Sequence, residues 1–192
     1  MIRRTCAWVA PLVLLLLGSC GLGEQTDKTD DADTGAAAGI TRLAIEDRVP
    51  GPDISGRDLE GGDVDISDWR GKVVVINVWG SWCPPCREET PILNRVATET
   101  SPDVEFLGIA IRESASTSLA FARKEEVPYP SISDSSGSLL TRFADPLPAV
   151  AVPTTYILDR GGRVAVRVLD QVTYSTLMAL IEDVQDEGRD GP

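Results

Sequence analysis

Residues 72–91 read KVVVINVWGSWCPPCREETP and predict a buried strand that passes directly into a helix. Residues 73–80 are almost entirely apolar and rich in β-branched side chains, as the central strand of a sheet is. Two prolines separate Cys83 from Cys86. Pro84 suits a helix start because the N–H that it lacks would have had no partner there. The stretch therefore places two cysteines where a strand becomes a helix.

Cysteines at this spacing can hold a metal, attach a haem, form a structural disulfide or exchange electrons. The chain has 4 cysteines and no histidine, so zinc lacks its usual set of four ligands. Covalent haem attachment needs a histidine where Arg87 stands. A structural disulfide remains the alternative, although so small a loop would restrict the unfolded chain little. The start of a helix stabilises a thiolate, which favours a redox-active pair that needs neither cofactor nor metal.

Composition limits the classes of function. The chain has 192 residues, of which 42% are hydrophobic, so one domain with an ordinary core is expected. The formal charge of −12 argues against a nucleic-acid partner. Without histidine, general acid–base chemistry must use other side chains.

The N-terminus has the pattern of a bacterial lipoprotein signal. Two arginines precede an apolar stretch at residues 7–17, which is too short to span a bilayer of roughly 30 Å. The stretch ends in LGSC, residues 17–20, which resembles a lipobox. We expect cleavage after residue 19 and a lipid on Cys20, which would hold the protein at the outer, extracytoplasmic face of the cell membrane. An ordinary signal peptide or an N-terminal anchor helix is the alternative.

The remaining chain divides into a tether, one domain and a tail. Residues 20–44 are rich in Asp, Thr, Gly and Ala and predict a flexible acidic tether, with an acidic docking segment as the alternative. Residues 45–187 are expected to form the domain, and residues 188–192 a short tail.

Apolar periodicity predicts the elements of this domain. After a hairpin that turns at Gly61-Gly62, strands are expected at 73–80, 104–111, 130–133, 154–159 and 163–169, and helices at 84–100, 116–126 and 173–186, with a helical turn at 136–143. Ser116 or Thr117 is expected to cap the second helix. This order indicates an α/β fold with a mixed sheet and helices on both faces.

Three separated motifs resemble the membrane-tethered thioredoxin-like thiol-disulfide oxidoreductases of the TlpA/ResA type. They are the opening stretch, VPTTYILDRGGRV at residues 152–164, and PDISGRDLEGGDVDISDWRGK at residues 52–72. The resemblance covers about residues 50–187. It implies a thioredoxin fold, with its mixed sheet flanked by helices, an N-terminal β-hairpin and an internal insertion within residues 113–143.

The resemblance also implies roles for single residues. Cys83 matches an exposed attacking cysteine and Cys86 a buried resolving one. Pro153 matches a cis-proline, a trans proline being the alternative, and Val152 would offer its backbone to an extended substrate. Glu89 matches an acid that exchanges protons with Cys86; the alternative is a solvated helix carboxylate.

Other residues near the cysteines have expected positions. Trp82, Pro84 and Pro85 are expected to contact substrate, whereas Trp79 suits core packing equally well. Asn77 stands where thioredoxin has a buried acid, and a neutral amide cannot move protons.

The function implied by the resemblance is reduction of disulfides in exported proteins, including apocytochrome c during haem attachment. Electrons would come from a membrane thiol-disulfide donor, and we expect a monomer. A disulfide oxidase or isomerase is the nearest alternative. A redoxin-type thiol peroxidase needs a threonine and an arginine around its cysteine, which Gly80-Ser81-Trp82 do not supply. A redox-silent binding lipoprotein is the remaining alternative.

Overall fold

The computed structural model describes residues 39–143, 148–149 and 151–187. The expected signal peptide, Cys20, the tether up to residue 38 and the C-terminal tail lie outside these residues. The elements are, in chain order, β1 (Ile40–Arg42), η1 (Ile45–Asp47), β2 (Ser55–Arg57), β3 (Asp63–Asp65), η2 (Ile66–Trp69), β4 (Val73–Trp79), α1 (Pro84–Thr100), β5 (Val104–Ile111), α2 (Ala115–Lys124), β6 (Ser131–Asp134), η3 (Leu140–Arg142), β7 (Thr154–Leu158), β8 (Val164–Leu169) and α3 (Tyr174–Glu187).

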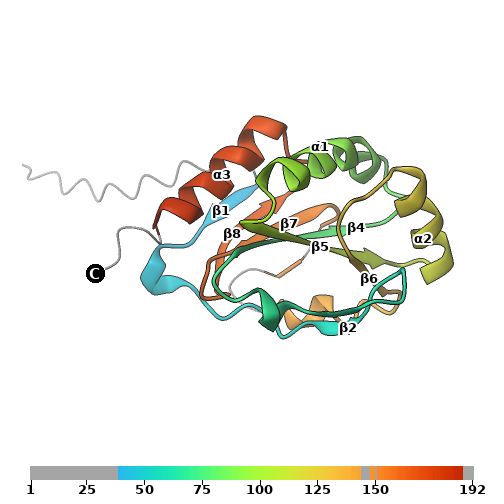
Figure 1. Ribbon diagram of the computed structural model, residues 1–192, viewed down its shortest axis with the longest axis horizontal. Helices are drawn as coiled ribbons and strands as arrows, with labels where there is room; N and C mark the ends of the chain where they lie inside the picture. The colour runs from blue at the N-terminus through green and yellow to red at the C-terminus, as the bar shows by residue number, and fades with distance from the viewer. Residues whose placement is uncertain (1–38, 144–147, 150, 188–192) are drawn as a thin grey trace, which may run out of the picture. The chain divides into compact units, whose positions relative to one another are not determined.

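A mixed six-stranded sheet forms the centre of the domain (Figure 1), in the order β1-β8-β7-β4-β5-β6. Strands β4, β5 and β6 are parallel, whereas β7 and β8 form an antiparallel hairpin beside β4. Gly162 makes this hairpin's turn with φ +72°, a conformation that costs glycine little. Strand β4 is buried along its whole length, which agrees with its apolar sequence.

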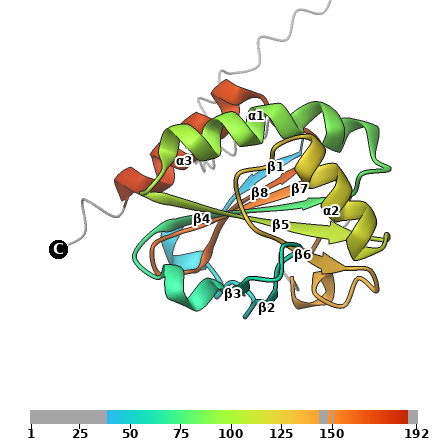
Figure 2. The same ribbon diagram turned by 45° about the vertical axis from the view of Figure 1, so that its right-hand side comes forward.

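The two faces of the sheet are covered differently. Helices α1 and α3 pack on one face and form a core with β4, β5, β7 and β8, and α2 lies beside α1 near the β6 edge (Figure 2). The other face is covered by the β2–β3 hairpin and by the 3-10 helices η2 and η3. The prediction of a mixed sheet flanked by helices is confirmed, although the three α-helices lie on one face and the helices on the other face are 3-10 helices. No helix within the described ranges is long and apolar enough to cross a membrane.

The folded domain begins earlier than residue 45, where the sequence places its boundary. Ile40–Arg42 form an edge strand that pairs with β8 in antiparallel register, Ile40 opposite Val168. The strand has only three residues, none of them buried, so it carries no apolar alternation by which the sequence could reveal it. Residues 40–44 thus belong to the domain and not to the tether.

The start of α2 also differs from its prediction. The helix begins at Ala115, and the Ser114 hydroxyl accepts a hydrogen bond of 3.2 Å from the Thr117 N–H. Ser114 is therefore the cap, in place of Ser116 or Thr117. Three neighbouring hydroxyl residues offer equivalent caps in sequence, and the end of β5 decides which one is used.

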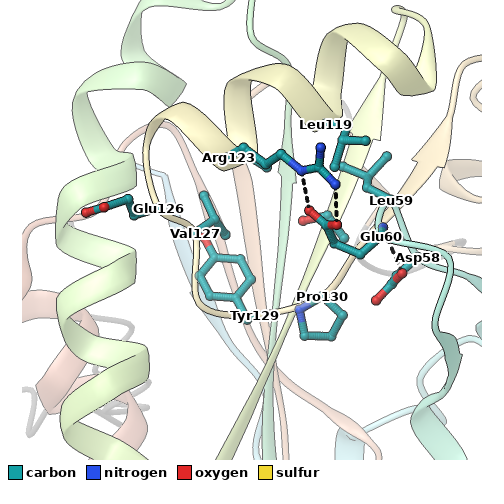
Figure 3. Close-up of a pocket in the computed structure, with 11 residues that line it drawn as sticks. Asp58, Leu59, Glu60, Leu119, Arg123, Glu126, Val127, Tyr129 and Pro130 are labelled. Atoms are coloured by element: carbon teal, nitrogen blue, oxygen red, sulfur yellow. Dashed lines mark hydrogen bonds and ion pairs between the residues drawn. The ribbon is translucent and has the colours of Figure 1, made fainter.

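The turn of the β2–β3 hairpin, residues 58–62, contacts α2 and the edge strand β6. Figure 3 shows Arg123 of α2 clamping the Glu60 carboxylate, with contacts of 2.9 and 2.7 Å. The Leu59 N–H donates a 2.8 Å hydrogen bond to the Ser131 carbonyl at the start of β6. These contacts bring Leu59 to the side of the sheet where the cysteines lie.

Arg48 joins the N-terminal segment to the opposite end of the domain. Its side chain is only 4% exposed and lies 3.3 Å from the Asp159 carboxylate, which is itself 9% exposed. Arg48 also pairs with Glu187 at the end of α3. Arg42, in contrast, forms a solvated pair with Asp183, the two side chains being 55% and 48% exposed.

We predict that Arg48→Met lowers the free energy of unfolding by about 1 to 3 kcal/mol, because it removes one of the two guanidinium partners of the buried Asp159 carboxylate and leaves it only Arg163. Arg42→Met is the matched control and should cost less than about 1 kcal/mol. Urea denaturation of the oxidised proteins measures both. Equal losses for the two variants would show that the buried pair contributes no more than the surface pair.

Candidate active site

The cysteines lie at the junction of β4 and α1. The chain leaves the sheet after Trp79, turns through Gly80–Cys83 with a 3.0 Å hydrogen bond from the Cys83 N–H to the Gly80 carbonyl, and enters α1 at Pro84. Cys83 is the N-cap residue, and its Sγ accepts a 3.4 Å hydrogen bond from the Cys86 N–H. The sulfur thus occupies the place where a helix favours negative charge.

Cys83 and Cys86 form a disulfide, with their Cα atoms 5.3 Å apart. The residues are 3% and 1% exposed, so the expected contrast between an exposed and a buried cysteine is absent from this oxidised form. The disulfide packs in an apolar cluster with Trp79 and Ala110. Burial does not distinguish the two sulfurs, whereas Cys83 alone occupies the N-cap position, where a helix stabilises a thiolate.

The Val152–Pro153 segment faces the disulfide. Its peptide bond is cis, as the resemblance implies. The Val152 carbonyl oxygen lies 3.8 Å from Cys83 Sγ. The two expected substrate-contacting residues are therefore next to the expected attacking sulfur.

Glu89 is completely buried on the face of α1 that packs on the sheet. Its Oε1 accepts a 2.8 Å hydrogen bond from the Asn77 side-chain amide in β4, and its Oε2 accepts one of 3.2 Å from the Val172 N–H. Asn77 also donates to Thr155 Oγ1 of β7 at 3.1 Å. The alternative of a solvated carboxylate is wrong, and Asn77 is the residue that holds Glu89 in place.

Burial raises the pKa of the Glu89 carboxyl from its ordinary value of 4.5 to about 7. The hydrogen bonds from Asn77 and Val172 stabilise the anion and limit this rise in pKa, while the nearby Asp170 carboxylate adds to it. A group with this pKa exchanges a proton readily at neutral pH. Glu89 lies one helical turn after Cys86 and is therefore suited to exchange protons with its thiol.

The two tryptophans have different environments. Trp79 is buried and packs on Phe121 of α2, with ring centroids 5.3 Å apart, behind the disulfide. A Cβ on Gly108 would come within 2.7 Å of its indole nitrogen, so glycine leaves the room that this ring needs. Trp82 is 47% exposed and donates a 3.1 Å hydrogen bond to the Ile111 carbonyl. Trp82 is thus open to a partner, whereas Trp79 is part of the core.

The loop between β8 and α3 completes the site, and the sequence gives no sign of it. The Asp170 N–H donates to the Pro153 carbonyl at 3.1 Å, and Asp170 itself has φ +91°. The Gln171 side chain contacts the Pro85 carbonyl at 3.4 Å.

Pro84 is exposed and Pro85 half-buried. No group of three metal-ligating side chains occurs in the part of the chain that the structure describes.

Comparison with known proteins places this geometry among redox proteins. The model of the AhpC/TSA family matches residues 47–167. The thiol-disulfide oxidoreductase ResA of Geobacillus kaustophilus (strain HTA426) is 28% identical over 176 residues, which are 91% of this chain and 92% of that protein.

Two solved structures from Corynebacterium are similar to this chain at 30% identity. A DsbF homologue from C. diphtheriae superposes with a TM-score of 0.71 over 78% of this chain and 96% of that one. A secreted thiol-disulfide isomerase from C. glutamicum gives a TM-score of 0.72 over 80% and 95%. These similarities confirm the resemblance and the thioredoxin fold that the sequence predicts.

The raised pKa of Glu89 predicts a pH-dependent stability. Below pH 4.5 the carboxyl is protonated in both the folded and the unfolded chain, and the pKa difference has no effect. Between pH 4.5 and about 7 the unfolded chain ionises while the folded protein keeps its proton, so the free energy of unfolding falls as the pH rises. The total fall attributable to Glu89 is about 3 kcal/mol.

Glu89→Gln removes the ionisation and should flatten this part of the curve, when urea unfolding of the oxidised protein is compared at pH values on either side of the range. Glu88→Gln is the matched control, because Glu88 is the exposed neighbour on the same helix, and should keep the wild-type slope. A wild-type slope in Glu89→Gln would show that Glu89 ionises normally in the folded protein.

Proposed function

Because the chain belongs to the AhpC/TSA family and is a thiol-disulfide oxidoreductase, we propose that it reduces disulfides of exported partner proteins. The observation that carries this proposal is the Cys83–Cys86 disulfide at the N-terminus of α1, facing the Val152–Pro153 segment. A partner chain lying along that segment in extended form would bring its own disulfide to Cys83 Sγ.

The reduced protein carries out two exchanges. The Cys83 thiolate attacks one sulfur of the partner's disulfide, and the other partner sulfur leaves as a thiolate, which takes up a proton. Cys86 then gives up its proton and attacks Cys83 Sγ, which releases the second partner thiolate and forms the 83–86 bond. The partner gains two electrons, and the pair Cys83 and Cys86 loses them.

Glu89 serves the second exchange. In its ionised form it accepts the Cys86 proton, so that a thiolate forms at a position far from solvent. The hydrogen bond from the Asn77 amide keeps one carboxylate oxygen fixed while the proton is moved. Trp82, Pro84 and Pro85 border the disulfide and provide contacts for the partner.

The proposal includes the direction of electron flow and the location of the protein in the cell. A membrane thiol-disulfide donor would return electrons to Cys83 and Cys86, and apocytochrome c is the partner that the TlpA/ResA resemblance suggests. The leader at residues 1–19 and Cys20 support an extracytoplasmic, lipid-anchored protein. The solved relative described as secreted is in agreement with an extracytoplasmic place.

The division of labour between the cysteines predicts different defects. Cys83→Ala should slow insulin reduction to the rate with dithiothreitol alone, because no thiol attacks. Cys86→Ser should still attack but fail to release its partner, so a mixed disulfide through Cys83 should accumulate and be visible by mass spectrometry. Accumulation in Cys83→Ala instead would reverse the assigned roles.

The reduction potential of the 83–86 pair decides between the proposed reductase and an oxidase. A value near about −270 mV, like that of thioredoxin, supports reduction, whereas one near about −120 mV supports disulfide formation. Removal of hydrogen peroxide faster than by free cysteine would instead indicate a thiol peroxidase.

Lipid attachment predicts where the protein is found. Cys20→Ala should move the full-length protein from the membrane to the soluble extracytoplasmic fraction, when it is followed by fractionation in a bacterial host. Its insulin reduction should be unchanged, because Cys20 takes no part in the proposed exchange. Retention of the variant in the membrane would contradict a lipid anchor at Cys20.

A further inference from the structure

We propose that Glu113 is a positioning residue: its carboxylate holds Ser81 and so fixes the turn that presents Cys83. This rests on the proposed attack by Cys83. Glu113 follows β5 and comes just before the Ser114 cap of α2, while Ser81 lies in the turn between β4 and Cys83. The two segments are thus joined directly in front of the reactive sulfur.

Both oxygens of the Glu113 carboxylate take part. Oε1 accepts a 3.0 Å hydrogen bond from the Ser81 N–H, and Oε2 accepts one from the Ser81 hydroxyl. Oε1 also accepts a 2.9 Å hydrogen bond from the hydroxyl of Ser118, which is completely buried in α2. Because a backbone donor and a side-chain donor of one residue meet the two oxygens, both the place and the orientation of Ser81 are fixed.

The neighbouring residue is fastened to the same strand end. The Trp82 indole donates to the Ile111 carbonyl, two residues before Glu113, at 3.1 Å. Within the turn, the Cys83 N–H donates a 3.0 Å hydrogen bond to the Gly80 carbonyl, which does not involve the polar groups of residues 81 and 82. The path of residues 81 and 82 therefore depends on contacts to residues 111–113.

These contacts gain importance when the disulfide is reduced. In the oxidised protein the bond to Cys86 holds Cys83 covalently. After reduction this covalent bond is gone. The position of Cys83 Sγ at the helix N-terminus then depends on the contacts that hold the preceding turn. A sulfur that moves away from the α1 N–H groups loses stabilisation of its thiolate and reacts more slowly at neutral pH.

A positioning effect can be separated from the effect of the charge. Glu113→Gln removes the charge but keeps an oxygen for the Ser81 N–H, and an amide can donate to hydroxyls that rotate to accept. Glu113→Ala removes both. Loss of a nearby negative charge alone would make the Cys83 thiolate more stable, which is opposite to the result expected from loss of position.

The experiment uses the full chain with Cys6→Ser, Cys20→Ser and Cys86→Ser, so that Cys83 is the one thiol left to titrate. The Cys83 thiol is titrated by its thiolate absorbance, and its alkylation by iodoacetamide is timed at neutral pH. Glu113→Ala should raise the thiol pKa and slow alkylation about tenfold, whereas Glu113→Gln should restore most of the parent behaviour. Ser81→Ala, which removes only the hydroxyl contact, should give a smaller change in the same direction.

Glu125→Ala is the matched control, because Glu125 lies at the opposite end of α2 and pairs with Lys124. Parent-like values in Glu113→Ala, or faster alkylation in both Glu113 variants, would overturn the proposal. Should Glu113→Ala fail to fold, parent-like alkylation of Ser81→Ala would overturn it. Absence of insulin reduction by the wild-type protein, with these alkylation differences intact, would reject the proposed function and not the role of Glu113.

Discussion

The positive N-terminus of α1 is the constraint on which the rest of the site depends. A thiol becomes a useful nucleophile only where its thiolate is stabilised, and in a chain without histidine the helix end provides that stabilisation. To place Cys83 there, β4 ends at Trp79 and the chain passes into α1 within four residues, Gly80–Cys83. The full burial of β4 gives this junction a rigid base.

The same arrangement creates the environment of Glu89. Helix α1 starts at the end of β4 and crosses the face of the sheet, so its second turn places Glu89 over Asn77 of β4, where the carboxyl is completely buried. A carboxylate there would be costly without donors, and Asn77 and Val172 supply them from a strand and a loop. The raised pKa is thus a consequence of where the cysteines must be, and it gives the protein an acid–base group near neutrality without histidine.

The sequence reveals the parts of this site that lie close together along the chain. The lack of histidine and the spacing of the two cysteines indicate that Cys83 and Cys86 are a redox pair, and the apolar run at residues 73–80 predicts β4. The partners of Glu89 come from residues 12 and 83 positions away, and no local pattern connects Asn77 or Val172 with it. Strand β1 is missed because three half-exposed residues gain their pairing only from β8. Ser114 is the cap of α2 because β5 ends at Ile111 and the helix begins at Ala115. The capping propensities of serine and threonine do not show which of the neighbouring hydroxyl residues is used.

Glu89 follows Cys86 in α1, and Glu113 contacts Ser81 in the turn before Cys83. The roles proposed for these two carboxylates require different surroundings. A proton carrier must be able to lose and regain its proton, so it benefits from burial and from few donors, as Glu89 has. A residue that holds a loop needs donors on both of its oxygens, and Glu113 accepts three hydrogen bonds beside the start of α2. A well-solvated Glu89 would have an ordinary pKa and would hold its proton too weakly for the Cys86 thiol. Without the donors from Ser81 and Ser118, Glu113 would no longer fix the turn. In the proposed mechanism, one carboxylate moves the proton of Cys86 and a different carboxylate positions the turn before Cys83.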